Sequence, residues 1–384
     1  MNKAIGWIVI IVLVVWGLSS LSGKSSKVDE VQKTVDTLST YKVGAIAPLT
    51  GDAATYGELV RNTLQIAADE INSSGGISGK RVEVIIEDGK CNGEGAVNAA
   101  QKLVNVDKVQ VIIGGFCSAE TLAALPVAET AKVALISAAS SNPSLTGKSS
   151  YFFRNFPSDS SQGSVLAQMA HDMGKRKVAF IQEQTDYTAG IYKAFADKFT
   201  SLGGQVIKEE YAPATKDFRT QLSKLQSQKA DALFIDSNIP ASADAITAQM
   251  IALKWNVSLF TNDITLGATD VLSKYKDALN GMVGAEFSTD SSNKTFAHLL
   301  EVYKTKYGKD MPYQSYGQTV YDAIYIVKDA ITKVGYDGTK IADFGHRIAN
   351  WNGASGSVTI GANGDLVGGH KARVFKDGKV QDLK

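Results

Sequence analysis

The stretch GGFCSAET, from Gly114 to Thr121, carries residue types and a spacing suited to binding a small anion. It follows the apolar run VQVII and precedes the helix-like segment LAALPVAETAK, so a buried strand is expected to end just before a helix begins. Ser118 would be the N-cap of a helix that starts near Ala119, where free backbone N–H groups and the helix dipole attract an anion. A ligand carboxylate fits this corner; the alternative is that Ser118 only caps its helix.

A second run of small polar residues, Ser137 to Ser141, ends the next predicted strand and favours the ligand interpretation. Ligands of open α/β sheets bind beyond the carboxyl ends of the strands, so these two neighbouring loops would offer hydroxyl and backbone groups to one point. The other strand-end loops are rich in Ser, Thr, Asn and Asp and contain Tyr56 and Tyr187; they are residues 48–56, 182–187, 236–240 and 261–264.

Motifs for catalysis or for cofactor binding are missing from the sequence. It contains no GxSxG elbow and no HExxH motif, and the GKS triplets at 23–25 and 147–149 lack the glycine five positions ahead that a phosphate loop needs. The four histidines fall in helical or tail segments; they are His171, His298, His346 and His370. We therefore predict a binding protein with no catalytic residue, no metal and no cofactor.

Composition excludes several other classes of protein. With 40 basic and 39 acidic side chains the formal charge is +1, which offers no field to steer nucleic acid, and nucleic acid is not an expected partner. The length of 384 residues and the 44% hydrophobic content indicate a folded chain with two or three domains.

The first 25 residues are typical of an exported protein. Lys3 precedes about fifteen nearly uninterrupted apolar residues, which are followed by small polar ones. A cleaved signal peptide and a retained membrane anchor both remain open, because the apolar run is short for a full span but could extend to Leu21. Residues 26–40 are expected to be a linker, and the rest of the chain is expected outside the cytoplasm, in the periplasm or at the cell surface.

Cys91 and Cys117 are the only cysteines of the sequence. In an exported chain an even pair most simply indicates one disulfide, and two separate buried thiols are the alternative.

From Tyr41 onward, apolar strand-like runs alternate with amphipathic helical segments, which predicts parallel sheets covered by helices on both faces. A second such series begins near Ser158, and turn signals mark a strand-rich end. The sequence thus predicts an α/β fold with two lobes.

The chain from Tyr41 to the end resembles the leucine/isoleucine/valine-binding proteins, which are type I periplasmic substrate-binding proteins of ABC importers. The segments that carry the resemblance are PLTGDAATYG, INSSGGISGKRVEVIIEDGKC, IIGGFCSAET, ISAASSNPSLT, FRNFPSDSSQG and TKDFRTQLSKL. The resemblance implies two hinged lobes joined by three crossovers, and its cysteine pair matches Cys91 and Cys117. Residues 41–158 and 286–352 would form the first lobe, and residues 159–285 and 353–384 the second.

The resemblance also implies a set of contacts. Ser118 matches the family's carboxylate-binding serine, and the loop of Ala139, Ser140 and Ser141 matches the one that touches the ligand's carboxylate and ammonium. Tyr56 and Tyr187 match aromatic walls from the two lobes. Asp159 matches an acidic residue at the first crossover, although it could simply cap the helix that follows.

The second lobe departs from the family pattern in two places. Asn238 stands where the branched-chain binders carry a tyrosine, and Ile264 stands where they carry the acid that pairs with the ligand ammonium. Asp263, one position away, is expected to supply that acid if the loop shifts by a residue, with Asp236 in reserve.

The expected function is capture of a small amino acid, branched-chain or similar, by hinged closure and its delivery to an ABC permease. The chain is expected to be a monomer, and it would contact the membrane through its N-terminal segment if that segment is not cleaved. The alternative is a membrane-anchored sensory receptor domain for a small carboxylate or amide.

Overall fold

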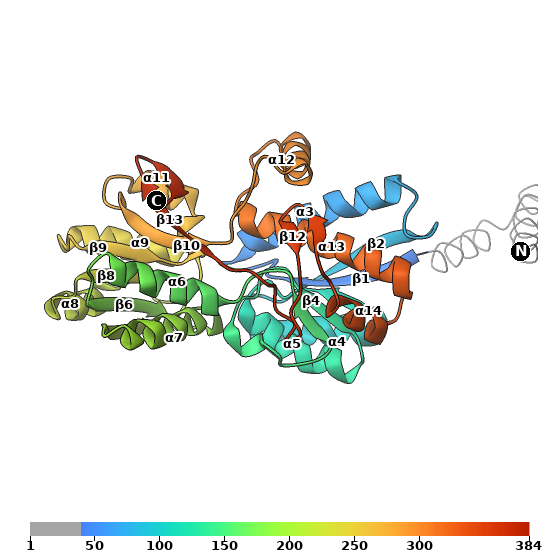
Figure 1. Ribbon diagram of the computed structural model, residues 1–384, viewed down its shortest axis with the longest axis horizontal. Helices are drawn as coiled ribbons and strands as arrows, with labels where there is room; N and C mark the ends of the chain where they lie inside the picture. Colours follow the sequence, from blue (N-terminus) through green and yellow to red (C-terminus); the bar gives the residue numbers. More distant parts are fainter. Residues whose placement is uncertain (1–39, 384) are drawn as a thin grey trace, which may run out of the picture.

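The computed structural model describes residues 40–383, so the predicted leader over residues 1–25 and the linker up to residue 39 lie outside the described residues. The described chain forms two α/β lobes side by side, the first on the right of Figure 1 and the second on the left. Each lobe has its own sheet, and the small hairpin β11–β12 forms a third, two-stranded sheet. Between residues 40 and 383, no helix combines the length and the apolar character needed to cross a membrane.

The first lobe is built on a parallel five-stranded sheet in the order β2-β1-β3-β4-β5. Its strands are β1 (Thr40–Ala47), β2 (Arg81–Asp88), β3 (Val111–Ile113), β4 (Ala134–Ser137) and β5 (Phe152–Arg154). Its helices are α3 (Ala54–Ser73), α4 (Gly93–Asn105), α5 (Ser118–Thr130), α12 (Lys294–Tyr307), α13 (Gln314–Val334) and α14 (Gly338–Gly345), with a short 3-10 helix η1 (Pro143–Leu145).

Alternating side chains of these strands enter different cores, as the period of two requires. Ile112 packs with apolar residues of α4 and α5 on one face of the sheet, whereas Ile113 packs with residues of α3 and α13 on the other. Both faces are therefore covered, which explains why the strands are apolar runs rather than amphipathic ones.

The second lobe is built on a seven-stranded sheet in the order β14-β13-β10-β9-β8-β6-β7, in which β13 and β14 run antiparallel to their neighbours. Its strands are β6 (Lys177–Glu183), β7 (Gln205–Tyr211), β8 (Ala232–Asp236), β9 (Ser258–Thr261), β10 (Met282–Glu286), β13 (Lys371–Lys376) and β14 (Lys379–Asp382). Its helices are α6 (Asp159–Asp172), α7 (Asp186–Ser201), α8 (Arg219–Ser227), α9 (Pro240–Ala252), α10 (Asp263–Leu266) and α11 (Thr269–Lys274).

The chain crosses between the lobes three times: between β5 and α6, between β10 and α12, and between β12 (Gly356–Val358) and β13. Three crossings at one place form a hinge about which two rigid lobes can close. The predicted two-lobed α/β fold with three crossovers is thus confirmed.

The lobe boundaries stay a prediction, and contacts of the third crossover bear on one of them. The backbone N–H groups of Ala354 and Ser355 donate to Asp322 of α13, and the Arg154 guanidinium pairs with Asp365. The strand β11 (Trp351–Gly353) and the residues after it therefore lie against the first lobe. These contacts favour a third boundary closer to Gly368 than to the predicted position between residues 352 and 353.

Strand order reverses between β1 and β3 in the first lobe and between β6 and β8 in the second. At such reversals the loops at the carboxyl ends of the strands diverge and leave a crevice for a ligand. The loops at these reversals lead to Tyr56 and Ser118 in the first lobe and to Tyr187 and Asn238 in the second. Residues that the sequence analysis named therefore lie at the crevice of each lobe.

Candidate functional site

The start of helix α5 forms one end of the candidate site. The helix begins at Ser118 and not near Ala119, and Cys117, in extended backbone, takes the capping position that was predicted for Ser118. The difference of one residue arises because the Glu120 side chain accepts a hydrogen bond from the Cys117 backbone N–H at 2.9 Å, which closes the first turn early. Ser118 therefore stands in the first turn, where the N–H groups of Glu120 and Thr121 bond to the Cys117 carbonyl and those of Ser118 and Ala119 have no partner within the helix.

A disulfide between Cys91 and Cys117 ties this corner to the loop after β2, as predicted. The Glu120 carboxylate reinforces the tie, because its two oxygens accept from the backbone N–H groups of Cys91 and Cys117 at 2.9 Å each. Burial raises the pKa of Glu120 to about 7 despite these two hydrogen bonds. The start of α5 is thus fixed by one covalent bond and one buried carboxyl.

The loop after β4 meets this corner. Ala139 and Ser141 line the pocket beside Ser118, and the Asn142 backbone N–H donates to the Ser118 hydroxyl at 3.3 Å. The Ser140 hydroxyl does not line the pocket; it donates to the Gly115 carbonyl at 2.8 Å and also lies within hydrogen-bond distance of the Cys117 carbonyl. Ser140 therefore braces the two loops, whereas its neighbours face the pocket.

Arg154, which the sequence does not single out, holds the same loop from behind. Its guanidinium is fully buried, donates to the carbonyls of Ser140 and Asn142 at 3.3 and 3.0 Å, and pairs with Asp365 at 2.8 Å. Burial lowers its pKa, opposed by the nearby Asp365. Nothing in the sequence marks this role, because Arg154 lies within a short strand and its partner is more than 200 residues away.

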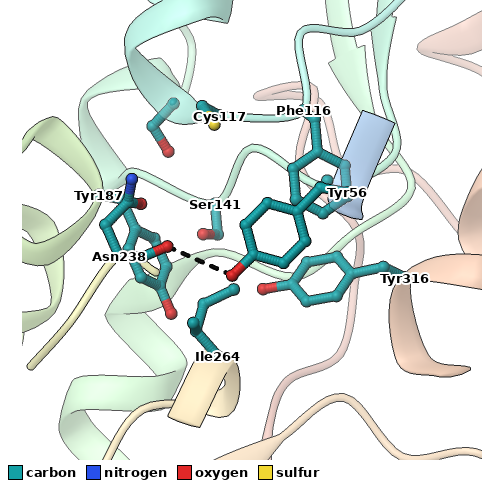
Figure 2. A pocket seen from close by; sticks show the side chains of 10 residues that line it. Tyr56, Phe116, Cys117, Ser141, Tyr187, Asn238, Ile264 and Tyr316 are labelled. Carbon is teal, nitrogen blue, oxygen red and sulfur yellow. Dashed lines mark hydrogen bonds between the residues drawn. The ribbon is translucent and has the colours of Figure 1, made fainter. Parts of the chain in front are cut away.

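Aromatic rings form the walls of the pocket (Figure 2). The Tyr56 ring stacks on Phe116 with centroids 4.9 Å apart, and Tyr316 of α13 lies 5.1 Å from Phe116. Tyr187 of α7, Asn238 and Ile264 complete the lining from the second lobe. Phe116 and Tyr316 were missed from the sequence: Phe116 lies in the opening stretch but is apolar, and Tyr316 is inside a long helix that only the crossovers bring to the pocket. Ile264 was named only as the residue at the position of the family's acid.

The two lobes are closed onto each other around this pocket. The Tyr56 hydroxyl donates to the Asn238 carbonyl at 3.4 Å, the Tyr316 hydroxyl donates to Asp263 at 2.6 Å, and the Asn142 amide donates to the Asp186 carbonyl. The cavity left between these side chains has a volume of about 20 Å³, which is room for about one water molecule, so the lobes are tightly closed around it.

Buried carboxyl groups lie behind the lining of the pocket, and one of them, Asp159, is next to Ser141. Asp159 is fully buried; its Oδ2 accepts from the Ser141 hydroxyl at 2.7 Å, and its Oδ1 has no hydrogen-bond partner among the described residues. Asp263 accepts from the hydroxyls of Tyr187 and Tyr316. The reserve residue Asp236 bonds to Asn262 and does not line the pocket.

These carboxyls have no ion-pair partner within residues 40–383, because no lysine, arginine or histidine lies within ion-pair distance of Asp159 or Asp263. Arg154 pairs with Asp365, and its charge only opposes the rise in the pKa of Asp159. Burial first, and Asp263 second, raise the pKa of Asp159 well above its ordinary value. The pocket thus lies between a helix N-terminus, which favours a negative group, and buried acids, which favour a positive one.

Comparison with known proteins agrees with this geometry. A family model described as "Periplasmic binding protein" matches residues 40–376. The chain is 27% identical over 335 residues to the Leu/Ile/Val-binding protein BraC3 of Rhizobium johnstonii, covering 84% of this chain and 88% of that protein.

Solved structures show the same architecture. The leucine-binding protein LivK of Thermotoga maritima superposes with a TM-score of 0.82 and 31% identity, covering 90% of this chain and 98% of that one. A solute-binding protein of an ABC transporter from Rhodopseudomonas palustris, in complex with 3,4-dihydroxybenzoic acid, superposes with a TM-score of 0.77 and 25% identity, covering 90% and 96% of the two chains. The predicted resemblance is confirmed.

Removal of the disulfide should lower stability without changing the fold. Cys91 and Cys117 are 26 residues apart, and closing a loop of that length contributes about 3.5 kcal/mol in the chain-entropy account. We expect the double variant Cys91→Ser, Cys117→Ser to lose about this much free energy of unfolding in urea titrations. Reductant should destabilise the native protein and leave the variant unchanged. Equal stability of the native protein and the variant in the absence of reductant would contradict the expectation.

Stability should also depend on pH through Glu120. Its pKa is about 7 in the folded protein and near its ordinary 4.5 when unfolded, so the folded state retains a proton that the unfolded state releases between those values. The Glu120 contribution to stability therefore falls as pH rises from about 4.5 to 7. A difference of that size between the two pKa values corresponds to about 3 kcal/mol.

The variant Glu120→Gln carries no such titration, although it loses one acceptor at every pH. The free energies of unfolding of the variant and of the native protein are measured in parallel urea titrations at pH 5 and pH 8. We expect the difference, variant minus native, to be about 3 kcal/mol more favourable to the variant at pH 8 than at pH 5. Parallel pH profiles for the two proteins would show that Glu120 does not titrate in this window.

Proposed function

The chain belongs to the periplasmic binding protein family, and we propose that it captures a small zwitterionic amino acid, branched-chain or similar, by closure of its two lobes. The observation that carries this proposal is that the N-terminus of α5 and the buried carboxyls of Asp159 and Asp263, which form no ion pair within residues 40–383, lie around the same small pocket.

The ligand carboxylate would rest on the first turn of α5. The N–H groups of Ser118 and Ala119, the Ser118 hydroxyl and the Ala139 backbone would contact it, since Ser118 and Ala139 both line the pocket. The disulfide and Glu120 hold these groups in place before the ligand arrives, so little ordering is required on binding.

The ligand ammonium would lie beside Ser141 and Asp159. A buried carboxylate oxygen without a partner costs free energy, and an ammonium placed there would offset that cost. Ser141, which already donates to Asp159, lines the pocket at this point and brings the carboxyl within reach of the ligand.

The ligand side chain would be apolar. Tyr56, Phe116 and Ile264 offer ring faces and an aliphatic surface, and apolar contact with them is favourable in proportion to the area buried. The name of the Rhizobium relative, a Leu/Ile/Val-binding protein, and that of the Thermotoga leucine-binding protein support this class of ligand.

Closure would follow from the division of these contacts between lobes. Carboxylate contacts come from the first lobe, whereas Tyr187, Asn238 and Ile264 come from the second, so a ligand gains its full set of contacts only in the closed form. Such a ligand shifts the population toward closure by its differential affinity for the two forms.

Location, partner and assembly are also part of the proposal. The family and the export-like first 25 residues support a place outside the cytoplasm, and the ABC-transporter solute-binding protein of Rhodopseudomonas supports delivery of the ligand to an ABC permease. The chain would act as a monomer, without catalysis.

A second candidate is a receptor for a small carboxylate or amide without an ammonium group. Ile264 faces the pocket where an acid was expected, and one structural neighbour holds a dihydroxybenzoate. The two candidates differ in whether the ligand must carry a positive charge.

A thermal-shift screen of the purified protein with amino acids, small carboxylates and amides tests the proposal. A ligand at a hundredfold its dissociation constant should stabilise the protein by about 2.7 kcal/mol. We expect apolar amino acids to raise the melting temperature; stabilisation by ammonium-free acids alone would favour the second candidate.

Substitution at Ser118 should abolish binding. The variant Ser118→Leu places a branched side chain in the space meant for the ligand carboxylate, and we expect no heat of binding in calorimetric titration with the best amino acid of the screen. Ser201→Ala, at the exposed end of α7, is the control and should bind as the native protein does. Unchanged affinity of Ser118→Leu would place the ligand elsewhere.

Substitution at Asp159 should weaken amino acids selectively. Hydrogen bonds to charged groups contribute about 1.5 to 3 kcal/mol, so Asp159→Asn should bind leucine about ten- to hundredfold more weakly. Its affinity for 4-methylpentanoate, which is leucine without the amino group, should change little in the same calorimetric titrations. Equal losses for both compounds would argue against contact between Asp159 and the ammonium.

A further inference from the structure

Asp263 stands next to the pocket without lining it. It is the first residue of α10, it is almost completely buried, and the following residue, Ile264, takes the place in the wall. A direct contact between this carboxylate and a ligand is therefore obstructed by its own neighbours.

Both oxygens of the Asp263 carboxylate are occupied by phenol groups. The Tyr187 hydroxyl donates to Oδ1, and the Tyr316 hydroxyl donates to Oδ2 at 2.6 Å. Both tyrosines line the pocket, Tyr187 from the second lobe and Tyr316 from the first, and Figure 2 shows the Tyr316 hydroxyl directed toward the middle of the pocket.

These two phenols present only acceptor atoms to a ligand. Burial, and after it the charge of Asp263, raises the pKa of Tyr187 and of Tyr316 well above the ordinary 10, so both keep their proton at neutral pH. A phenol has one proton to donate, and here Asp263 takes it. The remaining lone pairs of both oxygens can accept hydrogen bonds from a donor in the pocket.

The negative charge behind the phenols has no counter-ion in the described chain. No ion pair joins Asp263 to a lysine, arginine or histidine between residues 40 and 383. The imidazole of His370, which lies close enough to interact with Asp263 electrostatically, is neutral at pH 7 because burial lowers its pKa to about 4. Hydrogen-bond chains that end on a charge polarise each member, so both phenol oxygens become stronger acceptors.

We propose that Asp263 is a positioning residue for the ligand ammonium, acting through the hydroxyls of Tyr187 and Tyr316 rather than by direct contact. The inference rests on the proposed function, since it requires a ligand with an ammonium group. It assigns the selection of amines over ammonium-free acids to a carboxylate that the ligand never touches. Because one phenol comes from each lobe, the relay is complete only when the lobes are closed.

The experiment compares two ligands on each variant, so that general damage to the fold cancels. The Kd of leucine and the Kd of 4-methylpentanoate are measured by calorimetry, and their ratio reports the preference for the ammonium. We expect Asp263→Asn, which keeps the shape of the side chain, and Tyr316→Phe, which removes one phenol oxygen, to reduce this preference about ten- to hundredfold.

A matched control exists on the outside of the second lobe. The Tyr275 hydroxyl donates to Asp244 at 2.5 Å, which is the same tyrosine–aspartate pairing away from the pocket. Tyr275→Phe and Asp244→Asn should leave the ratio unchanged.

The possible outcomes separate the relay from the proposed function. If Asp263→Asn weakens leucine and 4-methylpentanoate by the same factor, Asp263 acts only in holding the lobes together, and the relay is refuted while amino-acid binding stands. If the native protein binds no amino acid, the proposed function fails and the relay fails with it. A reduced ratio in Asp263→Asn and Tyr316→Phe, but not in the two controls, supports the relay.

Discussion

Asp159 and Asp263 are buried where the two lobes meet, and no cation of the described chain pairs with either of them. Burying carboxyls in this way is costly unless hydrogen bonds or a positive charge compensate. Ser141, Tyr187 and Tyr316 supply part of the compensation, and each of these residues also lines the pocket. The cost that remains is the physical basis for expecting a positively charged group from outside the chain.

The start of α5, where the ligand carboxylate is proposed to bind, depends on a rigid frame. The disulfide and Glu120 fix the start of α5, and Arg154 holds the carbonyls of the adjoining loop from behind. Glu120 and Arg154 do not line the pocket, and of the disulfide only Cys117 does, so these supports leave the ligand contacts to other groups. Preorganised N–H groups then meet a carboxylate at little cost in ordering.

The sequence was sufficient for the fold because alternation of apolar strands and amphipathic helices is a local pattern that survives without knowledge of contacts. It also pointed to Tyr56, Ser118, Ser141 and Tyr187, since each lies in the loop or first helical turn after a strand whose end could be recognised, and all four line the pocket. Tyr316 could not be found in this way, because it lies inside α13 and reaches the pocket only through the second crossover.

Two details of the site could not be predicted from the pattern of residue types. The capping position shifted from Ser118 to Cys117 because of the Glu120 side chain, whose geometry no spacing rule predicts. The expected role of Asp263 also looked like a question of register, whereas the structure presents Ile264 in the wall and Asp263 behind two phenols. In both cases a side-chain hydrogen bond decided what the backbone pattern left open.

The walls of the pocket contain tyrosine and phenylalanine but no tryptophan within the described chain, and this has a spectroscopic consequence. Trp255 is buried in the outer core of the second lobe, and Trp351 donates to Asp329 on the first. Neither indole touches the pocket, so its emission has little reason to change when a guest arrives. The optical signal of occupancy should instead lie in the near-ultraviolet absorption of the phenols, whose surroundings change from water to a guest molecule.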